Sequence, residues 1–334
     1  MPLDPDIATL LDRVRRAARP PFESMTPADA RVAYRKASRV LDIATRPLPR
    51  VSEHRFLSRD GAPVRVRLYA ATADDESLPT LLYFHGGGFT IGSIESHDAV
   101  CRMLAHDTGC LVASVDYRLA PEHRFPTAAH DAQDALLWLV DHAEALGVDR
   151  SRVAIGGDSA GGTLAAVTAI RAREAGIACV LQLLIYPGTK RDDDTPSRRS
   201  LAEGYLLDAT TIAWFFDQYV PDPQQRDDWR YAPLDGRGPD GGPVALASAA
   251  PACIVTAGYD PLHDEGVAYA NRLAEAGVPV RRLGYPGMIH GFLQFAGAIP
   301  AARAAHRDIA AVLRHAFGTA ESPSLVAPPF EKTS

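Results

Sequence analysis

The sequence predicts an α/β fold in which helices cover both faces of a mostly parallel β-sheet. Short apolar runs without alternation recur along the chain, as expected for strands that are buried on both faces. Stretches with helical periodicity separate these runs, which is typical of a doubly wound sheet. The length of 334 residues suits one large α/β domain with an accessory part.

Residues 1–47 predict a polar helical segment ahead of the sheet. One face of a first helix is expected to hold the apolar residues Ile7, Leu10, Leu11 and Val14. Thr26 followed by Pro27 is typical of a helix N-cap and first turn, so a second helix is expected from there to about Ile43. A proline-rich stretch then marks the boundary with the sheet.

The predicted strands fall into two groups. Those at 51–57 and 64–69 alternate apolar and polar residues and flank Gly61, which is typical of an antiparallel hairpin. The others are short apolar runs, expected at 80–84, 110–115, 153–155, 180–185, 253–256 and 278–283. Helices are expected at 96–107, 127–146, 160–175, 262–276 and 299–317. Because these helices alternate with the strands, the later strands should run parallel.

Residues 188–240 depart from this alternation and are rich in Asp, Arg, Pro and Gly. The charge run at 190–194 is expected to be a solvated loop, and the aromatic residues of 214–219 predict a helix. An insertion of this kind between two strands is typical of a lid or cap over a site. The last stretch, 319–334, is polar and is expected to be a flexible tail.

The composition excludes several classes of function. With 23% charged residues and a net charge of −6, nothing favours binding to nucleic acid or to an anionic membrane surface. No window holds the roughly 18 apolar residues of a membrane span, and the N-terminus lacks the apolar core of a signal peptide. The 4 cysteines are scattered, which favours free thiols in a reducing compartment. We therefore expect a cytoplasmic protein that needs no metal.

The candidate nucleophile is Ser159, in the segment Gly157–Gly161 between a predicted strand and an alanine-rich helix. This G-x-S-x-G pattern requires that context, because its sharp turn tolerates only small neighbours and lifts the serine Oγ above the sheet edge. The following helix start offers free backbone N–H groups to a developing oxyanion. The alternatives are a glycine-rich turn without chemistry and a phosphate-binding turn, but the lysine-containing pattern of the latter is missing.

A second glycine-rich segment, His85–Phe89, follows the predicted strand at 80–84. Three consecutive glycines expose backbone N–H groups with no side chain in the way, as an oxyanion hole requires. We expect Gly86, Gly87 and Ala160 to supply the donors, with a flexible loop as the alternative. His85 is expected to fix the loop through a hydrogen bond rather than to act as a base.

The candidate base is His290, in a loop just past the last predicted strand, where a mobile imidazole can reach the serine. In folds with this strand-turn-helix serine, the carboxylate and then the histidine follow the nucleophile along the chain. His306 and His315 also follow it, but they fall in the terminal helix and are expected at the surface.

The candidate acid is Asp260, just after the strand at 253–256. It would lie at the carboxyl end of its strand, in the same crevice as the serine, where it can hold the imidazole tautomer and stabilise the imidazolium. Capping of the next helix is its alternative role. Asp264 and Glu265 compete with it, but in the first turn of that helix the dipole explains a carboxylate without further role.

Together these motifs resemble the hormone-sensitive-lipase-like esterases, the HGGG-type bacterial class IV family of the α/β-hydrolase fold. The resemblance covers roughly residues 50–317. Five motifs carry it in the right order, and these are His85–Phe89, Tyr117–Glu122, Gly157–Gly162, Asp260–Leu262 and His290–Phe292. Asp158 before the nucleophile points to the branch of the family with Asp rather than Thr at that position.

The resemblance implies an α/β-hydrolase fold with an eight-stranded sheet and a helical cap. The expected parts are 1–47 as the N-terminal part of the cap, 48–187 and 231–318 as the two parts of the core, and 188–230 as the cap insertion. Arg118 and Glu122 are expected to pair and brace the site. The resemblance also implies a small-molecule ester as substrate, no cofactor, and a homodimer as one mode of assembly.

The function that follows is a serine carboxylesterase that hydrolyses short-to-medium-chain acyl esters through an acyl-enzyme on Ser159. Four aromatic residues are candidates to line the substrate pocket, with plain core or cap packing as their alternative: Phe89, Tyr205, Trp214 and Phe215. An amidase, a lactonase or an arylformamidase would use the same triad. A non-catalytic receptor of the same fold is the other alternative, but such proteins lose the histidine that this chain keeps as His290.

Overall fold

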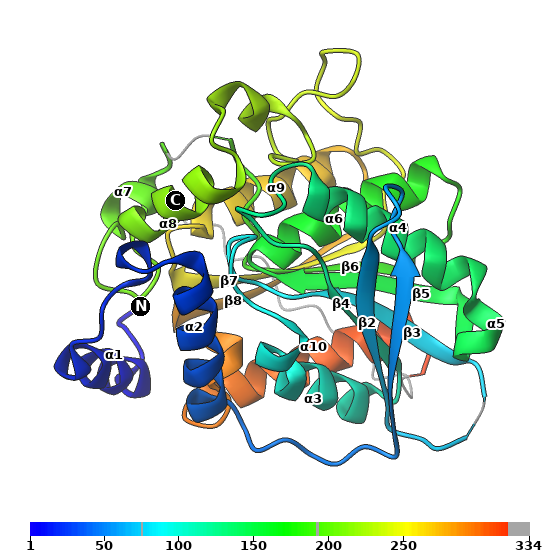
Figure 1. Ribbon diagram of the computed structural model, residues 1–334, viewed down its shortest axis with the longest axis horizontal. Coiled ribbons are helices and arrows are strands. Elements are labelled where there is room, and N and C mark those ends of the chain that lie inside the picture. The colour runs from blue at the N-terminus through cyan, green and yellow to red at the C-terminus, as the bar shows by residue number, and fades with distance from the viewer. Residues whose placement is uncertain (75, 192–193, 320–334) are drawn as a thin grey trace.

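The computed structural model describes residues 1–74, 76–191 and 194–319, so nearly all of the tail expected at 319–334 lies outside it. Eight strands form one sheet in the order β1-β2-β4-β3-β5-β6-β7-β8 (Figure 1). The strands are β1 (Arg50–Leu57), β2 (Pro63–Ala70), β3 (Leu78–Phe84), β4 (Leu111–Asp116), β5 (Val148–Asp158), β6 (Leu181–Ile185), β7 (Ala252–Tyr259) and β8 (Val280–Ile289).

The pairing confirms the predicted mostly parallel sheet. The strands β1 and β2 form the expected antiparallel hairpin, with Phe56 opposite Val64, and β2 is also antiparallel to β4. Every other neighbouring pair runs parallel. The carboxyl ends of β3, β5, β7 and β8 therefore meet at one edge of the sheet, where all four lead directly into predicted site segments.

Helices cover both faces of this sheet, as Figure 1 shows. One face packs against α4 (Thr127–Asp141), α6 (Ala160–Glu174) and α9 (His263–Glu275), and the other against α3 (Asp98–Thr108) and α10 (Pro300–Ala316). Consecutive residues of β3 show why its sequence does not alternate. Leu82 lies in the first core and Leu81 in the second, and both are fully buried.

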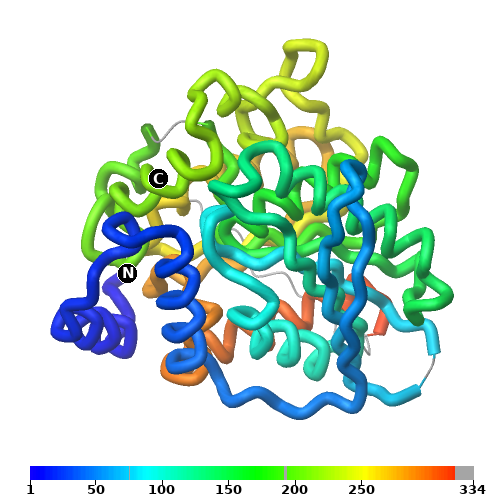
Figure 2. The backbone as a smooth tube through the Cα atoms, viewed as in Figure 1, coloured from blue at the N-terminus to red at the C-terminus, as the bar shows by residue number. Residues whose placement is uncertain are grey.

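Two helical segments lie together beside the sheet, at the left of the view in Figure 2. The first holds α1 (Pro5–Ala17) and α2 (Pro27–Leu41), and the second holds α7 (Pro196–Ser200) and α8 (Ala209–Tyr219). Thr26 caps α2 by accepting a hydrogen bond from the N–H of Asp29. The segments touch where the hydroxyls of Thr210 and Thr211 both donate to the carboxylate of Glu23, at 2.9 Å.

The last strand, β8, is longer than the sequence suggested. We expected it to end at 283, but it continues through Gly284, Pro286 and Gly287 to Ile289. An edge strand tolerates proline, since one side of it has no ladder to complete. Gly258 of β7 makes the fit possible, because a Cβ there would lie 2.2 Å from the carbonyl oxygen of Pro286. His290 therefore follows directly from a strand.

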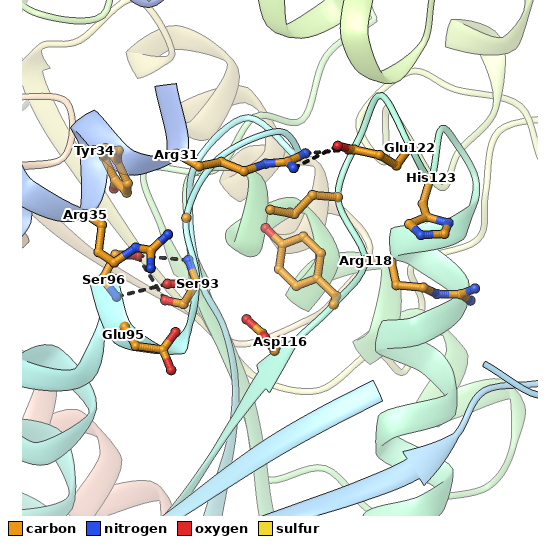
Figure 3. Close-up of a pocket in the computed structure, with 13 residues that line it drawn as sticks. Arg31, Tyr34, Arg35, Ser93, Glu95, Ser96, Asp116, Arg118, Glu122 and His123 are labelled. Carbon is orange, nitrogen blue, oxygen red and sulfur yellow. Dashed lines mark hydrogen bonds and ion pairs between the residues drawn. The ribbon is translucent and has the colours of Figure 1, made fainter. Parts of the chain in front are cut away.

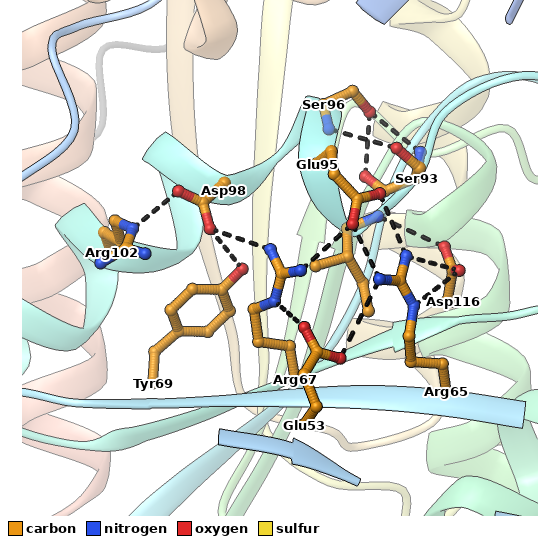
Figure 4. Close-up of polar contacts among 11 residues, drawn as sticks. Glu53, Arg65, Arg67, Tyr69, Ser93, Glu95, Ser96, Asp98, Arg102 and Asp116 are labelled. Atoms are coloured by element: carbon orange, nitrogen blue, oxygen red, sulfur yellow. Dashed lines mark hydrogen bonds and ion pairs between the residues drawn. The ribbon is translucent and has the colours of Figure 1, made fainter. Parts of the chain in front are cut away.

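Ion pairs tie the hairpin to the loop that precedes α3 (Figure 4). Arg65 of β2 pairs with Glu95 at 2.8 Å and with Asp116 at 3.0 Å, and Arg67 reaches Glu95 at 3.1 Å. All four side chains are partly buried, so these pairs fix the loop more firmly than exposed pairs would. This loop carries His97 into the site described below. Among the described residues, no helix is long and apolar enough to cross a membrane.

Candidate active site

Ser159 lies at the turn between β5 and α6, with φ 54° and ψ −122°. A non-glycine residue with this backbone is strained, and the surrounding structure must hold it there. Glycines make the turn possible by removing side chains from the closest approaches. A Cβ on Gly157 would lie 2.4 Å from the carbonyl oxygen of Gly161, and a Cβ on Gly161 would lie 2.0 Å from that of Phe84. The turn presents the serine hydroxyl at the edge of the sheet.

The structure brings Ser159, His290 and Asp260 into one hydrogen-bonded chain. The Nε2 of His290 lies 2.8 Å from the Oγ of Ser159, and its Nδ1 lies 2.8 Å from the Oδ2 of Asp260. A carboxylate can only accept, so Nδ1 carries the proton and Nε2 is left to accept from the hydroxyl. This geometry can activate the serine as a nucleophile.

Asp260 is fully buried, and its other oxygen, Oδ1, accepts the N–H of Leu262 at 2.8 Å. The N-cap of α9 is Leu262, so Asp260 does not cap that helix and the two oxygens of its carboxylate have different partners. One oxygen orders the turn into α9, and the other engages the imidazole. The turn thus fixes the carboxylate against His290. Such support is needed because a group that orients a base must itself be held in place.

Gly86 does not face the expected oxyanion hole, so its assignment as a donor is wrong. Its N–H donates to the Oδ1 of Asp158 at 3.0 Å and lies 3.3 Å from the Nε2 of His97. Gly87 and Gly88 adopt positive φ, at 121° and 56°, and no acceptor for their N–H groups is found among the described residues. Gly88 was missed because three equal glycines give no sign of which amide anchors the loop.

Asp158 is the group that anchors this loop. It is buried and accepts from the hydroxyl of Tyr83 at 2.7 Å and from Gly86, while the Nε2 of His97 lies 3.3 Å away. Burial alone would raise the pKa of Asp158, but the charge of His97 and the hydrogen bonds of His97 and Tyr83 outweigh it. The pKa therefore lies below its ordinary value and the group is ionised. Nothing in the sequence marked His97.

His85 occupies a structural position beside this loop. Its ring stacks on Tyr117 with centroids 4.3 Å apart, and its Nδ1 lies 2.8 Å from the carbonyl oxygen of Gly86. Burial lowers the pKa of His85 to about 4, so the ring is neutral and Nδ1 donates to that carbonyl. Among the described residues, the ring makes no hydrogen bond to Ser159 or Asp260, and its neighbours are Gly86, His97 and Tyr117.

A cavity of about 70 Å³ opens at Ser159. Phe89 and Phe215 line it as expected, whereas Tyr205 and Trp214 are not among its lining residues. Trp214 lies about 100° around α8 from Phe215, and Tyr205 packs on Tyr259 with ring centroids 5.2 Å apart. The other described residues that line the cavity are Gly88, Ala160, Thr163, Gly188, Lys190, Arg198, Leu207, Ile212, Phe216, Tyr231, Leu262 and Glu265.

A larger cavity of about 540 Å³ lies away from the serine, between α2 and the loops at 92–96 and 116–123 (Figure 3). At its rim Arg31 of α2 pairs with Glu122 at 2.6 Å and donates to the carbonyl oxygens of Thr90 and Ala120, at 2.8 and 2.7 Å. Arg31 therefore fastens the N-terminal helix to the end of the glycine loop. Nothing in the local sequence indicates this contact.

The expected pair of Arg118 with Glu122 is wrong. Arg118 pairs with the buried Asp131 at 2.7 Å and with Asp60 at 2.7 Å, while Glu122 is bound by Arg31. Figure 3 shows the Arg118 side chain directed away from Glu122. The peptide between the two residues turns, so that the long side chains leave on opposite sides of the loop.

Of the two histidines of the terminal helix, His306 and His315, one lies at the surface as expected. His315 is exposed, but His306 is 1% exposed, so its assignment to the surface is wrong. Its Nε2 donates to the carbonyl oxygen of Leu293 at 2.9 Å, and burial lowers the pKa of His306 to about 4. The small residues at 302 and 305, which are also buried, allow this face of α10 to approach the sheet.

Comparisons with known proteins agree with this geometry. A family model described as the alpha/beta hydrolase fold matches residues 81–294. The chain is 41% identical to an ethyl acetate hydrolase of Pseudomonas putida, over 90% of this chain and 94% of that one. It is 38% identical to the carboxylesterase NlhH of Mycobacterium tuberculosis, over 93% and 96%.

Solved structures are similar over almost the whole chain. An ester hydrolase from the metagenome of Lake Arreo has a TM-score of 0.88 and 40% identity, covering 95% of this chain and 100% of that one. A hyperthermophilic esterase from Pyrobaculum calidifontis has a TM-score of 0.87 and 39% identity, covering 96% and 100%. Such values at such coverage extend the likeness to the helical segments outside the family match.

Proposed function

The chain belongs to the hormone-sensitive-lipase-like esterases of the α/β-hydrolase fold, and from this membership we propose that it hydrolyses short-to-medium-chain acyl esters through an acyl-enzyme on Ser159. One observation supports the site assignment above all others. Contacts of 2.8 Å on both sides of His290 join the serine hydroxyl to a fully buried carboxylate. The chain is a carboxylic ester hydrolase in which this relay supplies the nucleophile.

Acylation begins when Nε2 of His290 takes the proton of Ser159 as Oγ attacks the ester carbonyl carbon. The carbonyl oxygen becomes an oxyanion, which accepts hydrogen bonds from the N–H groups of Gly87, Gly88 and Ala160. Each such donor contributes about 10²–10³ in rate. His290 then gives its proton to the leaving alcohol oxygen as the C–O bond breaks. Asp260 stabilises the imidazolium throughout, without itself taking the proton.

Deacylation repeats the sequence with water as the nucleophile. His290 takes a proton from the water, whose oxygen attacks the acyl carbon, and returns it to Oγ as the carboxylic acid leaves. Every proton in the cycle moves through one imidazole nitrogen. The same atoms would cleave an amide or a lactone, so the bond that is cleaved depends on the leaving group and on the pocket.

The cavity at the serine supports acyl chains at the short end of the range. Its volume of about 70 Å³ is several times what one water needs, which leaves room for only a few carbon atoms. Phe215 of α8 forms part of its wall, which supports a cap role for the segment 188–230. The cap role of the segment 1–47 stays a prediction. The cytoplasmic location and the homodimer stay predictions.

A chain-length series of p-nitrophenyl esters, from acetate to palmitate, tests this function. We expect the highest kcat/KM between acetate and hexanoate, a loss of about 10⁴-fold or more in Ser159→Ala, and far slower cleavage of the matched anilides. Equal activity of Ser159→Ala would refute the assignment. Anilides cleaved as fast as esters would make the protein an amidase instead.

A further inference from the structure

A buried arginine lines the cavity at Ser159. The side chain of Arg198 is 6% exposed, and it shares the cavity wall with Ser159, Phe215 and Phe216. Most of the surrounding wall is apolar. A purely hydrocarbon chain bound in this cavity would therefore offer the guanidinium no hydrogen-bond acceptor. Burying a charge is costly unless its hydrogen-bonding groups are satisfied.

Hydrogen bonds of the preceding residue hold Arg198 in this position. The preceding residue, Ser197, donates from its backbone N–H to the carboxylate of Asp264 at 2.8 Å and from its hydroxyl to the carbonyl oxygen of Pro261 at 2.8 Å. These bonds fasten α7 to the start of α9, immediately after Asp260. Arg198 is therefore fixed by the turn that carries the triad acid, rather than by a mobile part of the cap.

The hydrogen bonds of Arg198 are only partly made. Its Nη2 lies 3.4 Å from both oxygens of the fully buried Glu265, which is a long contact for a charged pair. Its Nε and Nη1 are buried and have no partner among the described residues. A guanidinium carries five N–H donors in a fixed fork, so a substantial part of that fork has no acceptor among the described residues.

The neighbouring charges leave this part of the cavity receptive to an oxygen acceptor. Burial raises the pKa of Glu265 to about 7, so its negative charge is weakened near neutral pH. Lys190, which also lines the cavity, is held by Asp194 at 2.9 Å and by Asp235 at 3.4 Å. Arg198 is therefore a cation of the described wall whose Nε and Nη1 have no acceptor among the described residues.

We propose that Arg198 forms a polar subsite that selects esters whose acyl chain carries a second oxygen acceptor, a keto or carboxylate oxygen a few carbons from the scissile carbonyl. This inference rests on the proposed function and names the substrate class of the same site. The acyl chain is the part in question, because an aromatic alcohol exceeds the small cavity that Arg198 lines. An acceptor oxygen completes the unfilled part of the guanidinium fork, whereas an alkyl chain displaces water from it without replacing the bonds.

The test compares p-nitrophenyl esters that differ only by this oxygen. The 4-oxopentanoate, 5-oxohexanoate and 6-oxoheptanoate are set against pentanoate, hexanoate and heptanoate, and the hemisuccinate and hemiglutarate form the carboxylate arm. We expect at least one ester with the oxygen to exceed its alkyl match in kcat/KM by about 10- to 100-fold. The arm that shows the preference identifies the acceptor as keto or carboxylate. No preference in either arm overturns the subsite.

The variant Arg198→Met/Glu265→Gln removes the cation without leaving a buried carboxylate unpaired. We expect it to reduce the oxo-to-alkyl ratio to about one, while Arg199→Met, the exposed neighbour, keeps the wild-type ratio. Because each ratio is measured on one preparation, it does not depend on the folded fraction. A double variant that retains the wild-type ratio refutes the role of Arg198.

The failure of this proposal can be told apart from the failure of the proposed function. If the wild-type protein cleaves the alkyl esters but shows no preference, the polar subsite is refuted and the esterase assignment stands. If it cleaves none of the esters in either arm, the proposed function is refuted. Arg198→Lys adds a readout for the planar fork, since a point-charge ammonium should restore only part of the preference.

Discussion

Tyr34, on the N-terminal helix α2, donates a hydrogen bond of 2.7 Å to the side chain of Gln294, four residues after the base. The amide of Gln294 in turn contacts His97, and His97 lies beside Asp158, the residue before the nucleophile. A polar chain, of which Gln294, His97 and Asp158 are buried, thus connects the N-terminal segment to the glycine loop. Such a network stabilises a unique arrangement only while each member is satisfied.

Replacement of Tyr34 by Phe tests that network. It leaves the buried amide oxygen of Gln294 without its donor, so we expect the free energy of unfolding to fall by about 1–3 kcal/mol in urea denaturation. We expect kcat to fall only a few-fold, because no reacting atom is touched. Tyr205→Phe is the matched control, since no hydrogen bond of its hydroxyl is found among the described residues, and it should change stability by less than about 0.5 kcal/mol. Equal effects would contradict the network.

The close approach of Gly88 to α8 predicts an activity loss that a second change relieves. A Cβ on Gly88 would lie 2.2 Å from the ring of Phe215, and φ there is +56°. Gly88→Ala should lower kcat/KM for p-nitrophenyl butanoate by about 10²-fold, as expected for a displaced oxyanion donor. In the Phe215→Ala background, Gly88→Ala should lower kcat/KM by less than it does in the wild-type protein, because the ring that it would clash with is gone. No recovery would place the damage in the backbone rather than in the clash.

The buried His306 predicts a loss of stability in mild acid. Its pKa of about 4 in the folded protein lies below the unfolded value of about 6.5, so the unfolded state binds more protons between these limits. Stability is therefore lost as the pH falls from 6.5 towards 4, by about 2 kcal/mol at pH 5. Urea unfolding of wild type and His306→Gln at pH 7 and pH 5 should show this difference. Parallel pH dependence of the two proteins would contradict it.

The corrected partners of Arg118 predict unequal effects of two changes. Arg118→Met leaves the buried Asp131 without its cation, so the free energy of unfolding should fall by about 3–5 kcal/mol. Glu122→Gln breaks a largely exposed pair with Arg31 and should cost less than about 1 kcal/mol. Thermal or urea unfolding measures both. Similar losses in the two variants would favour a direct pair of Arg118 and Glu122.

The fold could be predicted because its strands and helices differ in period. A run such as 110–115 is buried on both faces and lies between two helical stretches, which is typical of a parallel strand in a doubly wound sheet. The end of β8 could not be predicted, because Pro286 and two glycines resemble a turn. They lie on an edge strand because β8 pairs with β7, where Gly258 leaves room for Pro286. That pairing joins distant parts of the chain, so the sequence around Pro286 does not reveal it.

The triad could be predicted because Ser159, Asp260 and His290 each follow a strand of one parallel sheet, whose carboxyl ends meet. The donors of the oxyanion hole could not, since Asp158 engages the amide of Gly86 through a contact 72 residues apart in the chain. Arg198 was missed for the same reason. Its burial depends on how α7 docks against α9, which no local pattern of charge or period records.

The central claim is that Ser159 is the nucleophile, and an irreversible phosphonate ester tests it most directly. In ethyl p-nitrophenyl methylphosphonate, Oγ attacks phosphorus and p-nitrophenolate leaves, which makes an adduct that resembles the tetrahedral intermediate. We predict release of about one p-nitrophenolate per protein molecule, with the added mass on the peptide that holds Ser159 and no adduct in Ser159→Ala. An adduct on a different residue, with ester hydrolysis unchanged in Ser159→Ala, would contradict the account.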